Sequence, residues 1–387
     1  MLTRVELERT IPDHAASHSV RPKFYYPQLD CLRFMAFFLV FLSHNIPTGA
    51  KVLNHLGPRF LAVAIIVRDT VGFGLSLFFF LSSYLITSLL IMERRTSGTI
   101  NLRSFYIRRI LRIWPLYFAF LGGVALVGHW RAAEHISLPR FAAMSVLAGN
   151  WYCTVAGLGA FAIGPLWSIS VEEQFYAIWP GVFRSVSRKT FLWFTAGVAL
   201  ISIVSTGILA ARGVSSLGLW MNSLSEFAFF AGGGLFALMV PSIKMPNWRY
   251  ALTLTGGGAA LWFVAEIFCK INDRGLQPTP IRAIVGYLLV AIGCALLLRG
   301  ILYLAPGAIP KWLIYLGKIS YGLYVFHALA MHIVRSSPAS WPIRIPGVDL
   351  LTVLLITVAL AALSYKFLEK PFLQLKARFE SVRTRSA

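Results

Sequence analysis

The chain has 387 residues, of which 57% are hydrophobic and 13% are charged, and its mean hydropathy is +0.69. Soluble domains carry about 25% charged residues, so this composition excludes a soluble globular protein and predicts an all-α polytopic membrane protein. The net charge of +21 reflects 36 Lys and Arg against 15 Asp and Glu. Because basic residues accumulate at the cytoplasmic ends of membrane helices, we attribute this excess to topology and expect no nucleic-acid partner.

The N-terminal residues 1–28 contain several charged side chains and no apolar core. They therefore predict a cytoplasmic tail and not a cleavable signal peptide. We expect residues 29–373 to form the membrane domain and residues 374–387 to form a basic cytoplasmic tail.

Apolar runs of about 20 residues, the length that spans a bilayer, recur along the chain. They predict about ten transmembrane helices, near 31–48, 71–92, 113–129, 166–183, 191–210, 222–240, 250–268, 282–298, 319–334 and 349–367. The segment 141–160 is ambiguous, because Asn150 and several glycines interrupt it. If this segment crossed the membrane, every later loop would change sides, and more Lys and Arg would lie outside than inside. Because basic residues favour the cytoplasmic side, we expect a re-entrant or peripheral segment. With ten spans, both termini are cytoplasmic.

Four cysteines occur, and none of them forms a C-x-x-C pair. This spacing predicts no metal site and no redox site. A disulfide between Cys153 and Cys269 on the outer side is an alternative that the residues leave open.

The first predicted span carries three ionisable side chains, Asp30, Arg33 and His44. Such groups are costly inside a membrane, by a few kcal/mol each, and so need a partner or a function. At 100° per residue, Arg33 and His44 lie about 20° apart around the helix, and Asp30 and His44 about 40° apart. We therefore expect an acid, a guanidinium and an imidazole on one helix face.

A basic cluster, Arg108, Arg109 and Arg112, precedes the third predicted span and is interleaved with aromatic and aliphatic residues. On a helix, spacings of three and four form one patch. The patch is either a topology anchor at the lipid surface or a clamp for a phosphorylated ligand from the cytoplasm, because guanidinium groups bind phosphate oxygens in bidentate fashion.

Adjacent carboxylates, Glu172 and Glu173, fall inside the fourth predicted span. Glu172 shares a helix face with Tyr176, whereas Glu173 points about 100° away. Glu172 is either a buried acid neutralised by an arginine or a proton, or a functional group that orients an imidazole or binds a sugar hydroxyl.

The ninth predicted span carries a polar stripe of Ser320, Tyr324 and His327. His327 is either a helix-packing residue or part of a site.

Five motifs follow one another in order between Leu29 and Phe372. They are L-D-x-L-R-F with a His eleven residues after the Arg, F-Y-x-R-R-x-x-R-I-x-P-L-Y, L-W-S-x-S-V-E-E-Q-F-Y with W-P, S-Y-x-L-Y-x-x-H, and F-L-E-K-P-F. In this combination the chain resembles the acyltransferase 3 family of integral membrane O-acyltransferases. One departure is Ser83, which stands where the family has Gly in an S-G-Y motif.

The resemblance implies a transferase for O-acetylation in a bacterial cytoplasmic (inner) membrane. Its donor would be acyl-CoA, in the acetyl form (acetyl-CoA), used as a co-substrate from the cytoplasm with no bound cofactor. Its acceptor would be a hydroxyl of a sugar, in a surface polysaccharide or lipid-linked glycan. Longer family members carry an extracytoplasmic hydrolase-like domain, for which we expect this chain to be too short.

The resemblance also suggests residue roles. It implies His44 as the catalytic imidazole, Arg33 as its companion and Glu172 as a catalytic acid; Arg109 and Arg112, with Arg108, would bind the donor. A substrate pocket would contain Asp30, Trp167, Ser168, Tyr176, Tyr324 and His327.

Imidazole is well suited as a base for acyl transfer to a hydroxyl, although whether His44 acts as a base or carries the acyl group is open. Helix rise places His44 and Glu172 at similar depth in the outer half of the membrane. A transporter or proton-coupled carrier of a glycan or lipid is the alternative function, but it predicts two repeated halves, and none is detectable.

Overall fold

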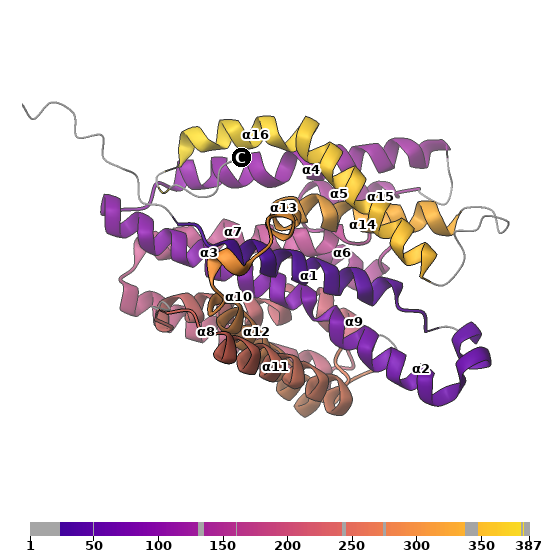
Figure 1. The fold of residues 1–387 in the computed structure, drawn as a ribbon. Helices are drawn as coiled ribbons and strands as arrows, with labels where there is room; N and C mark the ends of the chain where they lie inside the picture. The colour runs from indigo at the N-terminus through magenta and orange to yellow at the C-terminus, as the bar shows by residue number, and fades with distance from the viewer. Residues whose placement is uncertain are drawn as a thin grey trace, which may run out of the picture.

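The described part of the protein is a bundle of helices without β-strands (Figure 1). The computed structural model describes residues 24–48, 50–130, 135–159, 161–241, 245–273, 276–336, 347–380 and 382. In Figure 1, α4, α15 and α16 lie on one side of the bundle and α8, α11 and α12 on the other, with α1, α3 and α7 between them. Most of the predicted N-terminal tail, 1–28, lies outside the described residues.

A helix occurs at each of the ten predicted spans. These helices are α1 (Pro27–Asn45), α3 (Gly74–Ser97), α4 (Leu102–Trp130), α7 (Leu166–Ser185), α8 (Arg188–Ala211), α10 (Ser223–Met239), α11 (Trp248–Val264), α12 (Pro280–Leu302), α14 (Ser320–Arg335) and α15 (Val348–Ser364). Among the described residues, six helical stretches are long and apolar enough to cross a membrane, or seven if one bent helix pair is counted as a span. The polytopic membrane class is therefore supported, whereas ten spans and cytoplasmic termini stay predictions.

Helix α2 (Ala50–Gly72) was not among the predicted elements. Gly57 has a φ of 80°, so two helical pieces meet there at a kink, and Pro58 follows directly. Glycine tolerates this positive φ at little steric cost. Charged residues further along, Arg68 and Asp69, reduced the apolar signal of the second piece.

The ambiguous segment 141–160 is occupied by two short helices, α5 (Leu138–Ser145) and α6 (Gly149–Ala156). At 1.5 Å per residue, each is about 12 Å long, well short of a hydrocarbon core of about 30 Å. The buried Asn150 side chain donates to the Met221 carbonyl at 3.1 Å and to the Ser223 hydroxyl at 2.9 Å. These bonds hold α6 against α9 (Ser216–Met221) and the start of α10.

Cys153 and Cys269 are both buried and free. The alternative of a disulfide between them is therefore wrong.

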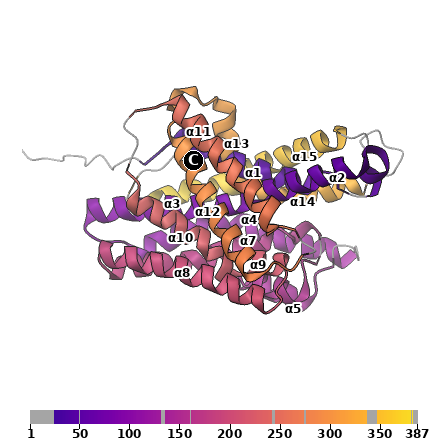
Figure 2. The same cartoon turned by 90° about the horizontal axis from the view of Figure 1, so that it is seen from below.

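Two further features shape the bundle around the site. Helix α13 (Lys311–Lys318) meets α14 at a bend of 73°. Helices α11 and α12 run across the direction of α3 and α8 (Figure 2). The remaining short elements are η2 (Phe161–Ile163), η3 (Ala265–Cys269), η4 (Pro306–Ala308), η6 (Tyr365–Glu369), α16 (Lys370–Lys376) and η7 (Ala377–Phe379).

Helices α3 and α10 approach closely at Gly233. A Cβ there would overlap the Phe80 carbonyl and lie 3.0 Å from the Tyr84 nitrogen. Small residues allow such backbone contact between membrane helices. The close approach fixes α3 against α10, and α3 forms part of the site described below.

We expect Gly233→Ala to lower the free energy of unfolding by about 1–3 kcal/mol, because overpacking forces these backbones apart. Thermal unfolding in detergent measures the effect. Gly256→Ala in α11 is the matched control, since a Cβ there meets nothing within 4 Å. Equal melting temperatures for Gly233→Ala and the unsubstituted protein would contradict the close contact.

Candidate active site

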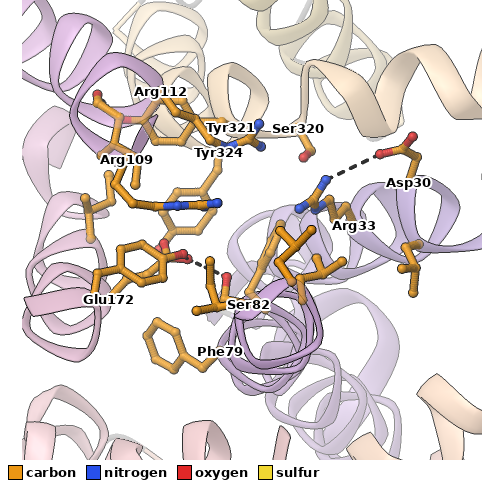
Figure 3. A pocket seen from close by; sticks show the side chains of 18 of the residues that line it. Asp30, Arg33, Phe79, Ser82, Arg109, Arg112, Glu172, Ser320, Tyr321 and Tyr324 are labelled. Carbon is orange, nitrogen blue, oxygen red and sulfur yellow. Dashed lines mark hydrogen bonds and ion pairs between the residues drawn. The ribbon is translucent and has the colours of Figure 1, made fainter. Parts of the chain in front are cut away.

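A first cavity of about 150 Å³ lies between α1, α3, α4, α7 and α14. Its lining includes four basic side chains, Arg33, Arg109, Arg112 and Lys376, but only two acidic ones, Asp30 and Glu172. Arg33 and Arg109 reach into it from opposite sides (Figure 3). The cavity is therefore suited to an anionic ligand.

The α1 side of this cavity is organised by an ion pair. Helix α1 begins at Pro27, and Asp30 lies in its first turn, where a carboxylate interacts favourably with the helix dipole. Asp30 is 3% exposed, and its Oδ1 lies 3.4 Å from Nη1 of Arg33 one turn later (Figure 3). Asp30 thus holds the Arg33 guanidinium at the cavity.

The opposite side joins Glu172 on α7 to a network of hydroxyl groups. The Ser82 and Tyr176 hydroxyls both donate to Glu172 Oε1. The Arg109 guanidinium lies over the Tyr176 ring, 5.4 Å from its centroid. The hydrogen-bond partners of Glu172 are therefore hydroxyls, and the expectation that it orients an imidazole is not met by this geometry.

Arg108 does not line the first cavity. Its Nη2 lies 3.1 Å from Glu93 Oε2, and its Nη1 donates to the Phe379 carbonyl at 2.6 Å. The basic cluster predicted from the sequence is thus divided: Arg109 and Arg112 line the cavity, while Arg108 joins α4 to α3 and to the C-terminal segment.

Lys376 is a cavity residue that sequence reasoning missed. Helix α16 continues through the expected boundary at residues 373 and 374 and packs on α4. Lys376 therefore lines the first cavity, and its Nζ also lies 3.1 Å from Glu380. Because Lys376 lies in a basic run near the C-terminus, the sequence predicted only that it belongs to a cytoplasmic tail.

A second cavity, of about 140 Å³, contains the two imidazoles, His44 and His327. Their ring centroids are 5.3 Å apart in an edge-to-face arrangement. Trp167, at the start of α7, is also in the lining. Among the residues that the structure describes, no group of three or more His, Cys, Asp or Glu side chains could hold a metal ion.

Backbone carbonyls define the tautomer of both imidazoles. His44 Nδ1 lies 2.8 Å from the Val40 carbonyl, and His327 Nδ1 lies 2.5 Å from the Tyr324 carbonyl. Because a carbonyl oxygen only accepts, each neutral ring carries its proton on Nδ1 and an acceptor lone pair on Nε2. His327 Nε2 is buried with no hydrogen-bond partner among the described residues. The second cavity thus presents groups able to accept a proton.

Arg68, Asp69 and Asn272 also line the second cavity, and sequence reasoning missed them. Arg68 donates to Asp69 twice, from Nε at 2.7 Å and from Nη2 at 2.9 Å. The Asn272 amide donates to the Asp69 carbonyl at 2.7 Å. Arg68 and Asp69 are adjacent charged residues in an otherwise apolar run of sequence. This pattern was the signal that could have indicated a site there.

A single layer of side chains separates the two cavities. Leu75 on α3 and Tyr324 on α14 are the residues that line both. The Tyr324 hydroxyl is 2.7 Å from the Ser168 hydroxyl and 3.3 Å from the Pro165 carbonyl, which joins α14 to the start of α7. Glu172 and His44, expected at similar depth, line different cavities on either side of this layer.

The fold and cavities define a polytopic helical membrane protein in which a cavity lined by an excess of basic side chains adjoins a cavity with two imidazoles. Residues 26–366 match the family model described as an acyltransferase domain, Acyl_transf_3, and the chain belongs to this family. The expected family is thereby confirmed.

Curated relatives have similar sequences over most of this chain. The peptidoglycan O-acetyltransferase OatA of Listeria monocytogenes is 26% identical, over 81% of this chain and 54% of the relative. A Bacillus subtilis protein named "Putative peptidoglycan O-acetyltransferase YrhL" is 27% identical, over 77% of this chain and 50% of the relative. A protein of Staphylococcus aureus strain COL named "Putative O-acetyltransferase" is 26% identical, over 90% of this chain and 57% of the relative. The chain spans about half the length of these relatives, and no solved structure matches it.

We expect Arg108→Met to lower the free energy of unfolding by about 3 kcal/mol, because it leaves the buried Glu93 carboxylate without its charged partner. Thermal unfolding in detergent tests this. Arg103→Met, at an exposed position on the same helix, is the control. If the two variants unfold at the same temperature, Arg108 has no structural role.

Proposed function

We propose that the protein transfers an acetyl group from acetyl-CoA in the first cavity to a sugar hydroxyl in the second. The observation that carries this proposal is the contact between the cavities, since a basic cavity and an imidazole cavity share one wall at Tyr324. A donor held by its phosphates could present its thioester at that wall. Family membership supports acyl transfer over the alternative of a transporter.

The basic residues of the first cavity would bind the donor. Arg33, Arg109 and Arg112 supply guanidinium groups that suit phosphate oxygens, and Lys376, which also contacts Glu380, adds a fourth basic group. Glu172 would act as a positioning residue, because it fixes the Tyr176 ring beneath Arg109. This role differs from the catalytic role implied by the family motif.

His44 would act as the general base. Its Nε2 lone pair accepts the proton of the acceptor hydroxyl while the hydroxyl oxygen attacks the thioester carbonyl. A C–O bond forms, the C–S bond breaks, and the proton passes from the imidazole to the departing thiolate. The Nδ1–H bond to the Val40 carbonyl stabilises the imidazolium formed in between. In this scheme His44 does not carry the acyl group.

The acceptor would be a sugar polymer or lipid-linked glycan of the bacterial cell surface. Two of the relatives are named for peptidoglycan O-acetylation, and the second cavity offers polar groups from Arg68, Asp69 and Asn272 near the imidazoles. We place the protein in the bacterial inner membrane, with both termini cytoplasmic and the first cavity open to cytoplasmic acetyl-CoA.

His44→Asn is expected to lower kcat for acetyl transfer by about 10²–10⁴-fold, the usual contribution of a general base. The assay follows label from radioactive acetyl-CoA into glycan in membranes. His129→Ala, at an exposed position at the end of α4, is the matched control and should retain full activity. Undiminished transfer by His44→Asn would refute the assigned base.

Arg112→Gln should raise KM for acetyl-CoA by about 10–100-fold and leave kcat within about threefold, since a hydrogen bond to a charged group contributes about 1.5–3 kcal/mol. The same assay at varied donor concentration measures both constants. Arg103→Gln controls for the loss of one positive charge from α4. A fall in kcat at constant KM would argue against donor binding by Arg112.

A further inference from the structure

The wall between the cavities depends mainly on one aromatic side chain. Tyr324 is 8% exposed and lines both cavities, and Leu75 is the other residue shared between them. The Tyr324 hydroxyl reaches across to α7, where it pairs with Ser168 at 2.7 Å. The ring thus spans the space between α14 and α7 and closes the direct route from one cavity to the other.

Tyr324 also lies next to the imidazoles. Its ring centroid is 5.5 Å from that of His327, which in turn is 5.3 Å from that of His44. On the other side, the Phe78 ring packs against it in an edge-to-face contact, with centroids 5.9 Å apart. An acyl group entering from the first cavity therefore meets this tyrosine before it meets either imidazole.

We propose that Tyr324 determines which acyl chains the protein transfers, by limiting the length of chain that fits at the wall. This inference rests on the proposed acyl transfer. During that reaction the thioester C–S bond breaks and a C–O bond forms, so the acyl carbon must lie within bonding distance of a hydroxyl in the second cavity. The chain beyond the carbonyl must then fit beside the Tyr324 ring, held in place by Ser168.

Packing against a fixed ring makes selection by size effective. A methyl group adds little bulk at the wall, whereas each further methylene must displace the ring or adopt a strained conformation. One methylene in a fitted apolar pocket changes kcat/KM by about 10–200-fold. The wall therefore favours acetyl over propionyl, and propionyl over butyryl.

The test compares acetyl-CoA, propionyl-CoA and butyryl-CoA as donors for the full chain in membranes. The unsubstituted protein is expected to prefer acetyl over butyryl by at least about tenfold in kcat/KM. Tyr324→Ala should bring this ratio close to one, chiefly by increasing butyryl transfer, which misfolding cannot produce. Tyr117→Phe is the control, because Tyr117 is a fully buried tyrosine that donates to the Met144 carbonyl at 2.9 Å and lines neither cavity.

Two milder variants retain most of the packing if Tyr324→Ala does not fold. Tyr324→Phe and Ser168→Ala each remove the 2.7 Å hydroxyl contact and keep a ring at position 324. Both should raise the butyryl-to-acetyl ratio severalfold. An unchanged ratio in every folded variant, or equal use of the three donors by the unsubstituted protein, would overturn the inference. Absence of any acyl transfer by the unsubstituted protein would instead refute the proposed function.

Discussion

The packing of α1 against the bent pair α13 and α14 is the constraint on which both cavities depend. A Cβ at Gly317 would overlap the backbone of Asp30, so only glycine permits this approach. The chain then turns by 73° at the start of α14, and α14 runs beside α1, with the Phe37 and His327 rings 6.3 Å apart. As a result α1 lines the first cavity near its start, at Asp30 and Arg33, and the second near its end, at Val40 and His44.

Ionisable groups in an apolar bundle must be stabilised. Several charges in this chain are neutralised in pairs, as in the contact of Arg108 with the 3% exposed Glu93. At the first cavity the charges do not balance, because four basic side chains line it with two acidic ones. Arg109 Nε is buried with no hydrogen-bond partner among the described residues. Such an excess is costly in apolar surroundings, and an anionic ligand would offset it.

Much of the helical framework could be predicted from the sequence, because long apolar runs define membrane helices independently of their neighbours. All ten predicted spans contain a helix. The second piece of α2 was missed, since Arg68 and Asp69 interrupt its apolar pattern. The distant contact that helps to hold this piece, from the Asn272 amide to the Asp69 carbonyl at 2.7 Å, forms only in the folded chain. The bend at α14 and the passage of α16 over α4 likewise depend on tertiary packing.

The candidate site was predicted less completely, because it too depends on contacts between helices that are distant in the sequence. Periodicity correctly placed Arg109 and Arg112 on one patch, but it could not show that Arg108 turns to Glu93. Helix rise gives the depth of His44 and Glu172 along their own helices. It gives no information on a tyrosine from a third helix that separates them. Which residues share a cavity is a property of helix packing.

The dividing wall has a consequence beyond substrate choice. In the proposed topology the first cavity opens to the cytoplasm and the second receives a glycan from the membrane or the outer side. Cavities that merged would form a polar path across the bilayer, open to water and protons. The side chains of Leu75 and Tyr324, which line both cavities, interrupt that path much as hydrophobic constrictions close channels. In the proposed reaction, only the small acyl group crosses between the cavities. The rest of the donor stays in the first cavity, and the rest of the acceptor stays in the second.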